Sequence, residues 1–212
     1  MKFTITCTAF CRLAGIPAFF EPKTDEEIKK QLSCVRLENY KGQIFGVSTN
    51  QKVAAVERLG TTTERDGAVH IALNPALVKQ CNDEIAYDSF LEIIYVPEIL
   101  TASAKTMLGF VLPGNAAAIG LPEHSVLSHW RSWVPPAPAK KSKGAMYWNA
   151  DHVAALAQAS PSGQIVFPEL IDVDQPVIIR DCSTPDWFGM FIAKPAPSDP
   201  TPQPATAPDW AR

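Results

Sequence analysis

Residues 35–60, VRLENYKGQIFGVSTNQKVAAVERLG, contain the pattern that decides the fold. Apolar, β-branched and aromatic residues gather here in three runs of strand length. Turn-forming residues separate the runs, at 39–42 (Asn-Tyr-Lys-Gly) and at 49–51 (Thr-Asn-Gln). The stretch therefore predicts three consecutive strands, over 32–39, 42–50 and 52–60.

A strand and a helix precede these three strands, and the same order of elements returns twice. Residues 2–7 alternate as a strand does, and Phe10, Leu13 and Ala14 give 8–18 one apolar helix face. The pattern predicts a second copy as strand 67–73, helix 74–81 and strands 89–96, 98–103 and 105–112. It predicts a third copy as strand 144–148, helix 150–159 and strands 163–170, 175–182 and 186–193. Three copies of a βαβββ unit indicate an α+β repeat architecture.

Two proline-rich stretches divide the chain. VPPAPAKKSKG (134–144) joins three prolines to three lysines without a hydrophobic period, which is typical of a surface linker. The tail AKPAPSDPTPQPATAPDWAR offers almost no apolar residue to a core. We therefore predict a domain of two units over 1–133, a linker over 134–143, a half-domain over 144–195 and a disordered tail over 196–212.

The composition excludes several classes of protein. Among 212 residues, 46% are hydrophobic and 19% are charged, which is globular and not disordered. The net charge of −3 excludes a simple, strongly basic nucleic-acid binder, although one basic face on an acidic body stays compatible. No apolar run approaches the roughly 20 residues of a spanning helix, and the first residues show no secretory signal. We expect a cytoplasmic protein without a membrane partner.

Five stretches, taken in order, resemble the DNA sliding clamps, the family of the bacterial β-clamp and PCNA. In that family each domain is two βαβββ units, with sheets outside and helices lining a central hole. The resemblance covers most of residues 1–195 and depends on the order of the stretches, since none is diagnostic alone. The stretches are MKFTITCTAFCRLAG (1–15), residues 35–60 quoted above, GAVHIALNPALVKQC (67–81), LSHWRSWVP (127–135) and QPVIIRD with WFGMFIAKP (175–181 and 187–195).

The resemblance implies a non-enzymatic processivity factor that encircles double-stranded DNA without reading its sequence. Its partners would be a DNA polymerase or another protein with a clamp-binding peptide, and it would need no cofactor. Clamp rings close with twelve units, so three units per chain imply a homotetramer, or a homotrimer if a fourth unit is present. Rings of identical subunits use head-to-tail interfaces. The reduced size suggests a shortened variant from a phage or mobile element.

By this resemblance, DNA contacts fall on basic residues of the helices and nearby loops, because phosphate attraction permits sliding. The basic lining is thin, since the third helix carries no Lys or Arg and the loop lysines lie beside acidic residues. The alternative is a clamp-fold interaction module, an inhibitor or decoy, that does not track DNA. The predicted DNA-binding residues are Arg12, Lys23, Lys29, Lys30, Lys79, Lys140, Lys141 and Lys143.

Three tryptophans are predicted to contact partner proteins: Trp130, Trp133 and Trp210. The first two precede the linker, and the last is a lone aromatic residue on the tail, where a docking peptide is one interpretation. Core or subunit-interface packing is the other interpretation of Trp130 and Trp133, and a chance occurrence is the other interpretation of Trp210.

No catalytic or metal-binding residue is predicted. Motifs of nucleophile elbows, phosphate loops and zinc proteases are absent from the sequence. His124 and His129 lack a third ligand, as do Cys7 and Cys11. Asp172, Asp174 and Asp181 are the carboxylates that a metal-dependent nuclease would need, but turn and strand-end positions explain them more simply. A hydrolase or nuclease is therefore the third and weakest hypothesis.

Overall fold

The computed structural model describes eleven segments of the chain. These are residues 2–19, 33–73, 75–84, 89–96, 99–105, 116–117, 126–134, 146–147, 149–167, 176–192 and 194–195.

The first unit is the most regular and follows the predicted order. It contains β1 (Lys2–Thr6), α1 (Cys7–Gly15), the 3-10 turn η1 (Ile16–Phe19), β2 (Cys34–Tyr40), β3 (Gln43–Thr49) and β4 (Val53–Thr61). The Thr6 hydroxyl caps α1 by accepting the Ala9 N–H at 3.1 Å. Between β2 and β3, Lys41 and Gly42 both have positive φ, as a two-residue hairpin requires. The predicted helix 8–18 is too long, because α1 ends at Gly15 and tightens into η1.

The second and third units repeat this order. The second contains β5 (Gly67–Ala72), α3 (Pro75–Glu84), β6 (Phe90–Val96), β7 (Ile99–Lys105) and β8 (Ala116–Ala117). The third contains β9 (Met146–Tyr147), α5 (Ala150–Ala159), β10 (Ile165–Val166), β11 (Pro176–Asp181), β12 (Trp187–Ile192) and β13 (Lys194–Pro195). The predicted α+β array of about three βαβββ units is confirmed.

One short element was not predicted. Residues 126–133, expected only as an aromatic run, form the 3-10 turn η3 (Val126–His129) and the single-turn helix α4 (Trp130–Trp133). Of the predicted strand 105–112, only Lys105 is described, and it belongs to β7. The predicted linker (beyond Val134) and tail lie outside the described residues, so those boundaries stay predictions.

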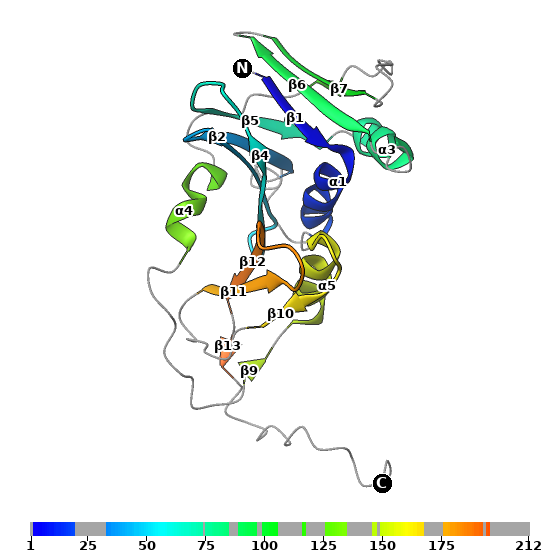
Figure 1. Cartoon of the computed structure of the whole chain (residues 1–212). Coiled ribbons are helices and arrows are strands. Elements are labelled where there is room, and N and C mark those ends of the chain that lie inside the picture. Colours follow the sequence, from blue (N-terminus) through cyan, green and yellow to red (C-terminus); the bar gives the residue numbers. More distant parts are fainter. Residues whose placement is uncertain are drawn as a thin grey trace, which may run out of the picture.

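The units form two large sheets by exchanging strands. The seven-stranded sheet has the order β10-β11-β12-β4-β3-β2-β5, and the four-stranded sheet has the order β1-β6-β7-β8. Figure 1 shows α1, α3 and α5 together on one side of these sheets and α4 on the other. The first and third units meet where β12 pairs antiparallel with β4, with Gly189 opposite Ala55.

Two close contacts fix the helices against the seven-stranded sheet. Leu13 of α1 lies over Gly46 of β3, and Leu156 of α5 lies over Gly189 of β12. Both leucines are fully buried in the main core, together with Phe3, Phe10, Leu37 and Trp187. A strand glycine at each site lets the helix approach the backbone closely.

Candidate partner-binding face

The seven-stranded sheet has two apolar faces because its strands alternate. Along β4, Val53 and Ala55 belong to the core under α1 and α5, whereas Ala54 and Val56 belong to a second cluster on the opposite side. We call that opposite side the α4 face. Its buried residues are Cys34, Val47, Ala54, Val56, Leu127, Trp130 and Met190, with Phe45, Trp133, Ile178 and Phe188 packed around them.

Trp130 anchors α4 to this face. Its side chain is buried, with the residue 5% exposed, and its indole Nε1 donates a hydrogen bond of 2.9 Å to Oε2 of Glu38 on β2. The ring packs between Phe45 and Phe188, with centroid distances of 5.7 and 6.4 Å. A polar partner for a buried indole N–H makes this position specific for tryptophan.

Glu38 is the buried charge around which the α4 face is built. Its other oxygen accepts a bond of 2.5 Å from Arg131, and Arg36 lies 3.3 Å from Oε2. Burial by itself would raise the pKa of Glu38, but the bonds from Trp130 and Arg131 and the two arginine charges hold it below its usual range. A buried carboxylate with several donors is the form in which a charge is tolerated inside a protein.

The network continues to the edge of the sheet. Nη1 of Arg36 lies 3.3 Å from the Ser128 hydroxyl and 3.4 Å from Nε2 of His70 on β5. Burial, with the nearby charge of Arg36, lowers the pKa of His70 to about 4, so this ring is neutral at physiological pH. η3, β2 and β5 are thereby tied together.

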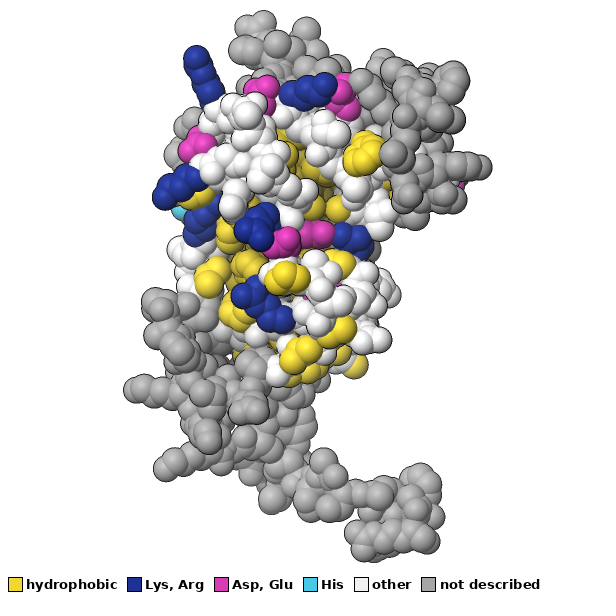
Figure 2. Space-filling view, viewed as in Figure 1, with side chains coloured by type: hydrophobic (Ala, Val, Ile, Leu, Met, Phe, Trp, Pro, Cys, Tyr) yellow, Lys and Arg dark blue, Asp and Glu magenta, His cyan; other side chains and the backbone are white. Residues whose placement is uncertain are grey.

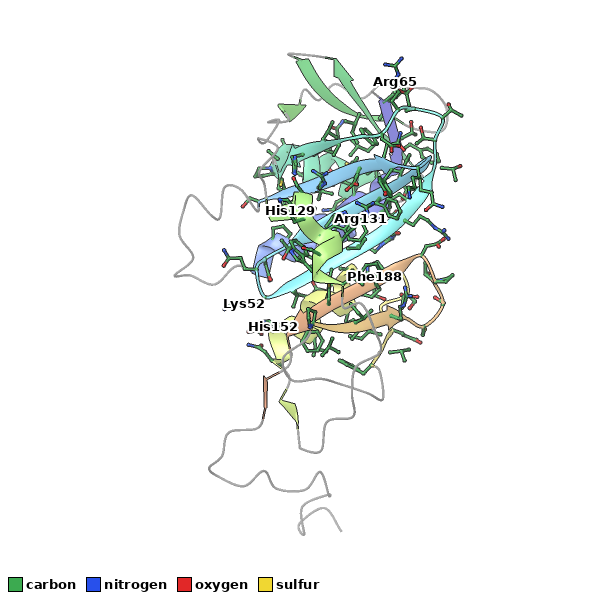
Figure 3. All side chains as sticks on the ribbon, turned by 90° about the vertical axis from the view of Figure 1, so that its left-hand side faces the viewer. Lys52, Arg65, His129, Arg131, His152 and Phe188 are labelled. Carbon is green, nitrogen blue, oxygen red and sulfur yellow. The ribbon has the colours of Figure 1, made fainter. Side chains whose placement is uncertain are left out.

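Arginine and aromatic side chains line the accessible part of the α4 face. The Arg131 guanidinium lies 4.2 Å from the ring centroid of Tyr40 and 4.3 Å from that of Trp130, and Arg180 lies 5.7 Å from that of Phe188. Tyr40 is 38% exposed, and Phe45, Trp133 and Phe188 are half-buried. Figure 3 shows Arg131 on α4 and Phe188 on the neighbouring strand facing the same side.

This face crosses the junction of the first and third units. Phe188 belongs to β12 and Phe45 to β3, and β4 lies between these two strands. Aromatic and arginine side chains of this kind dominate the energetics of protein–protein interfaces. Chemically, the arrangement suits an apolar or aromatic peptide of a partner protein.

The predicted partner-binding tryptophans differ in their positions. Trp130 is covered by its own chain, Trp133 is half-buried at the margin of the same cluster, and Trp210 lies outside the described residues. Sequence reasoning missed Glu38, Arg36 and Arg131. A signal was present, because Arg36 and Glu38 are charged residues at alternate positions of a strand whose other residues are mostly apolar.

Two predicted DNA-binding residues are described, and each has an acidic partner. Arg12 of α1 is mostly buried, and its Nη2 lies 2.6 Å from Oε1 of Glu57. Lys79 of α3 is exposed and lies 2.6 Å from Asp83 one turn later. Lys23, Lys29, Lys30, Lys140, Lys141 and Lys143 lie outside the described residues, so all eight assignments stay predictions. Figure 2 shows basic and acidic side chains next to one another across the face in view.

The described residues contain no cluster of metal ligands. Among them, no group of three or more His, Cys, Asp and Glu side chains is placed to hold a metal ion. Asp181 instead accepts hydrogen bonds from Ser160, Ser162, Ser183 and Thr184, which close two turns around it. Asp172, Asp174 and His124 lie outside the described segments. In the same part of the chain, no helix is long and apolar enough to cross a membrane.

Solved structures of other proteins share the fold of this chain, whereas comparisons of its sequence find no match. No family model and no curated protein matches this sequence. Among solved structures, DNA polymerase III subunit beta from Pseudomonas aeruginosa is similar with a TM-score of 0.59 at 11% identity, over 91% of this chain and 66% of that chain. The same subunit from Borrelia burgdorferi, in complex with a natural product, gives 0.58 at 11%, over 91% and 62%. The Thermotoga maritima subunit gives 0.57 at 9%, over 91% and 65%.

These likenesses establish the sliding-clamp fold for this chain. The chain spans less than two thirds of the length of these structures. At about one identical residue in ten, the likeness extends to the arrangement of strands and helices and to nothing finer.

Proposed function

We propose that this protein is a shortened DNA sliding clamp, a ring of identical chains that encircles duplex DNA and tethers partner proteins. The observation that supports it is the match of 91% of the chain to DNA polymerase III beta subunits. The protein would be a non-enzymatic, cytoplasmic processivity factor, and its reduced length fits a phage or mobile element. Encirclement needs no base contacts, so water-mediated phosphate contacts suffice for sliding.

In this proposal α1, α3 and α5 face the DNA. The three helices form one continuous surface, since α1 contacts both α3 and α5. Lys79 of α3 is exposed and would contact phosphate directly. Arg12 of α1 is paired with Glu57, so it would contact phosphate only in competition with that carboxylate. The loop lysines predicted from the sequence would supply the remaining positive charge.

Partner proteins would dock on the α4 face. Tyr40, Phe188, Trp133 and Arg131 combine apolar area with a planar cation at the unit junction. A partner peptide with aromatic or branched apolar side chains fits this chemistry. We expect Trp133→Ala to weaken partner binding without loss of the fold, because Trp133 is half-buried and outside the Glu38 network.

The experiment compares retention on circular and linear DNA. The protein is assembled on a nicked circular plasmid, and the complex is isolated by gel filtration at raised salt. A ring stays on the circle and is released when a restriction enzyme linearises it, because topological retention survives salt that screens phosphate contacts. Equal release from circle and line contradicts encirclement.

A second candidate function is a clamp-fold interaction module that binds a protein and not DNA. It is favoured by the charges of the three helices, where Arg12 and Lys79 are matched by Glu57 and Asp83 and α5 adds Asp151. If neither circular nor linear DNA retains the protein while an aromatic peptide binds the α4 face, this function is the correct one. Trp133→Ala then weakens the only measurable activity, peptide binding.

A further inference from the structure

Three of the five cysteines lie together where α1 packs on α3. Cys7 and Cys11 are four positions apart on α1, so their side chains share one face of that helix. Cys81 lies in the last turn of α3. The two helices contact each other, and Figure 1 shows them side by side. The fold thereby brings to the two α1 cysteines a third one that is distant in the sequence.

Cys81 contacts both of the α1 cysteines. Its side chain is hydrogen-bonded to Cys11 and to Cys7. The Cys11 thiol also donates a long hydrogen bond of 3.9 Å to the carbonyl oxygen of Val78, three positions before Cys81 on α3. All five cysteines of the chain are thiols in this structure. Contact between sulfur atoms on two facing helices is the arrangement from which a disulfide forms with little movement of the backbone.

The three cysteines differ in their exposure to solvent. Cys7 and Cys81 are fully buried in the main core, whereas Cys11 is half-buried and packs at the margin of that core. A small oxidant dissolved in water therefore reaches Cys11 before it reaches the other two. A thiol that is both accessible and next to a second thiol is typical of a site of reversible oxidation.

The surroundings of Cys11 also favour its reactive form, because the thiolate and not the thiol attacks an oxidant. The hydrogen bond from Cys81 lowers the pKa of Cys11, and the nearby charge of Arg12 lowers it further. Burial and Cys7 oppose this shift without reversing it. The hydrogen bonds to Cys11 and Cys7, together with burial, raise the pKa of Cys81, so Cys81 keeps its proton. Cys11 is thus the attacking thiol of the cluster.

We propose that Cys11 is a site of oxidation by hydrogen peroxide and that it then forms a disulfide with Cys81, which links α1 to α3. The Cys11 thiolate attacks one peroxide oxygen, the O–O bond breaks, and the departing hydroxide takes up the proton that Cys11 released. The Cys81 sulfur then displaces the hydroxyl group of the Cys11 sulfenic acid, and the Cys81 proton leaves with that hydroxyl as water. Two thiols are oxidised by two electrons in total, and one peroxide is reduced to two waters.

This disulfide joins the first unit to the second by a covalent bond. It closes a long loop of the chain, so it restricts the unfolded state and stabilises the native one. A thiol such as glutathione reverses it by exchange. In a reducing compartment a bond of this kind is transient and reports oxidation, unlike the permanent disulfides of secreted proteins. The inference goes beyond the proposed function and does not depend on it, because the thiols react within one chain.

The test is the mass of the chain after treatment with hydrogen peroxide, by mass spectrometry of the intact protein and by peptide mapping without reduction. The parent protein and all variants carry Cys182→Ser, which removes the exposed thiol and prevents bonds between chains. Remaining thiols are alkylated before digestion. Cys7→Ala is the matched control for Cys11→Ala, because it removes from the same helix face a thiol that the proposed bond does not use. Circular dichroism checks the fold of each variant.

We expect the oxidised parent to lose about 2 Da, the mass of two hydrogen atoms, and to yield a peptide that joins Cys11 to Cys81. Dithiothreitol should restore the original mass. Cys7→Ala should form the same bond, and Cys11→Ala should form none. Cys81→Ala should instead accumulate the sulfenic acid of Cys11, which dimedone traps. The oxidised parent should also unfold at a higher urea concentration than the reduced parent.

An unchanged mass, a disulfide between any other pair of cysteines, or a disulfide that forms equally in Cys11→Ala overturns the inference. A disulfide that forms only after urea has unfolded the chain overturns it as well, because the contact between α1 and α3 then plays no part. Mapping of the parent decides the question even if a variant of a buried cysteine fails to fold. This inference and the proposed function fail separately, because oxidation is measured without DNA and plasmid retention is measured without peroxide.

Discussion

The first and third units share the contact between their helix and their sheet, but they differ in what covers the second strand and the outer surface of the helix. In both, a capped helix places a leucine over a strand glycine, and their last strands join in one sheet. They differ in that the second unit covers the second strand and the helix of the first unit, whereas among the described strands none pairs with the outer edge of β10, and Ala150 and Ala154 of α5 are exposed. The difference shows that the outer edge of β2 in the first unit is covered by a strand of the second unit, β5.

Substitutions at the shared leucine–glycine contact are expected to lower the unfolding free energy more than the other changes considered. A Cβ on Gly189 would lie 2.6 Å from Leu156 and 2.9 Å from the Trp187 ring, and a Cβ on Gly46 would lie 2.4 Å from Leu13 and 2.9 Å from Leu59. Overpacking of this kind costs about 1–3 kcal/mol of unfolding free energy. We expect Gly189→Ala to cost about 3 kcal/mol and Gly46→Ala about 2 kcal/mol in urea denaturation. Leu59 is only partly buried and can shift, whereas the Trp187 ring is fully enclosed.

Gly15→Ala is the matched control for these two substitutions. A Cβ on Gly15 meets nothing within 4 Å, and the residue closes α1. Alanine in a helix is favoured over glycine by roughly 0.5–1 kcal/mol, so this variant should be neutral or slightly more stable. If all three variants had equal stability, the helices would not be seated on the glycines as described.

The sequence predicts the units better than it predicts their contacts. The Asn149 cap and the apolar spacing of 150–159 define α5 to the residue, because both signals are local. The pairing of β12 with β4 joins residues more than a hundred positions apart, and no local pattern specifies it. The candidate face was missed for the same reason, since α4 is held by a carboxylate on β2 that is distant in sequence. Likewise, the sequence does not show that Glu57 lies beside Arg12, which is one of the predicted DNA-binding residues.

Asp181 of the third unit and Glu57 of the first unit differ in how their buried charges are satisfied. Burial by itself would raise the pKa of Asp181, but hydrogen bonds from Ser160, Ser162 and Ser183 hold it far below its usual range. The carboxylate therefore stabilises the native state above the ordinary Asp pKa of about 4, and that contribution disappears as the pH falls below it. We expect Asp181→Asn to cost about 2 kcal/mol near pH 7, with a smaller difference from wild type in acid, measured by denaturation across pH.

Glu57, one of the buried carboxylates of the first unit, supplies the comparison. Burial raises the pKa of Glu57 despite the Arg12 charge, and its Oε2 has no hydrogen-bond partner among the described residues. A buried pair with unsatisfied atoms stabilises weakly, and apolar replacement of both partners is often neutral or favourable. We expect the double variant Arg12→Met/Glu57→Met to lie within about 1 kcal/mol of wild type or above it. A destabilisation as large as that of Asp181→Asn would show that the two carboxylates are equivalent after all.

The smallest effect on stability, and the sharpest on function, is expected at Lys79 of the second unit. α3 carries this exposed lysine, whereas α5 has no basic side chain other than His152. Its pair with Asp83 contributes only about 0.3–0.5 kcal/mol, so Lys79→Ala should leave the urea midpoint almost unchanged. If the helices face DNA, removing one phosphate interaction reduces the magnitude of the slope of log affinity against log salt by about 0.9.

Lys52→Ala, which removes an exposed lysine at the turn before β4, is the control for this substitution. A slope that becomes shallower for Lys79→Ala alone places DNA on the helices. A slope that becomes equally shallow for both variants indicates diffuse attraction, because two lysines on different parts of the surface then act alike. An unchanged slope removes α3 from the DNA face.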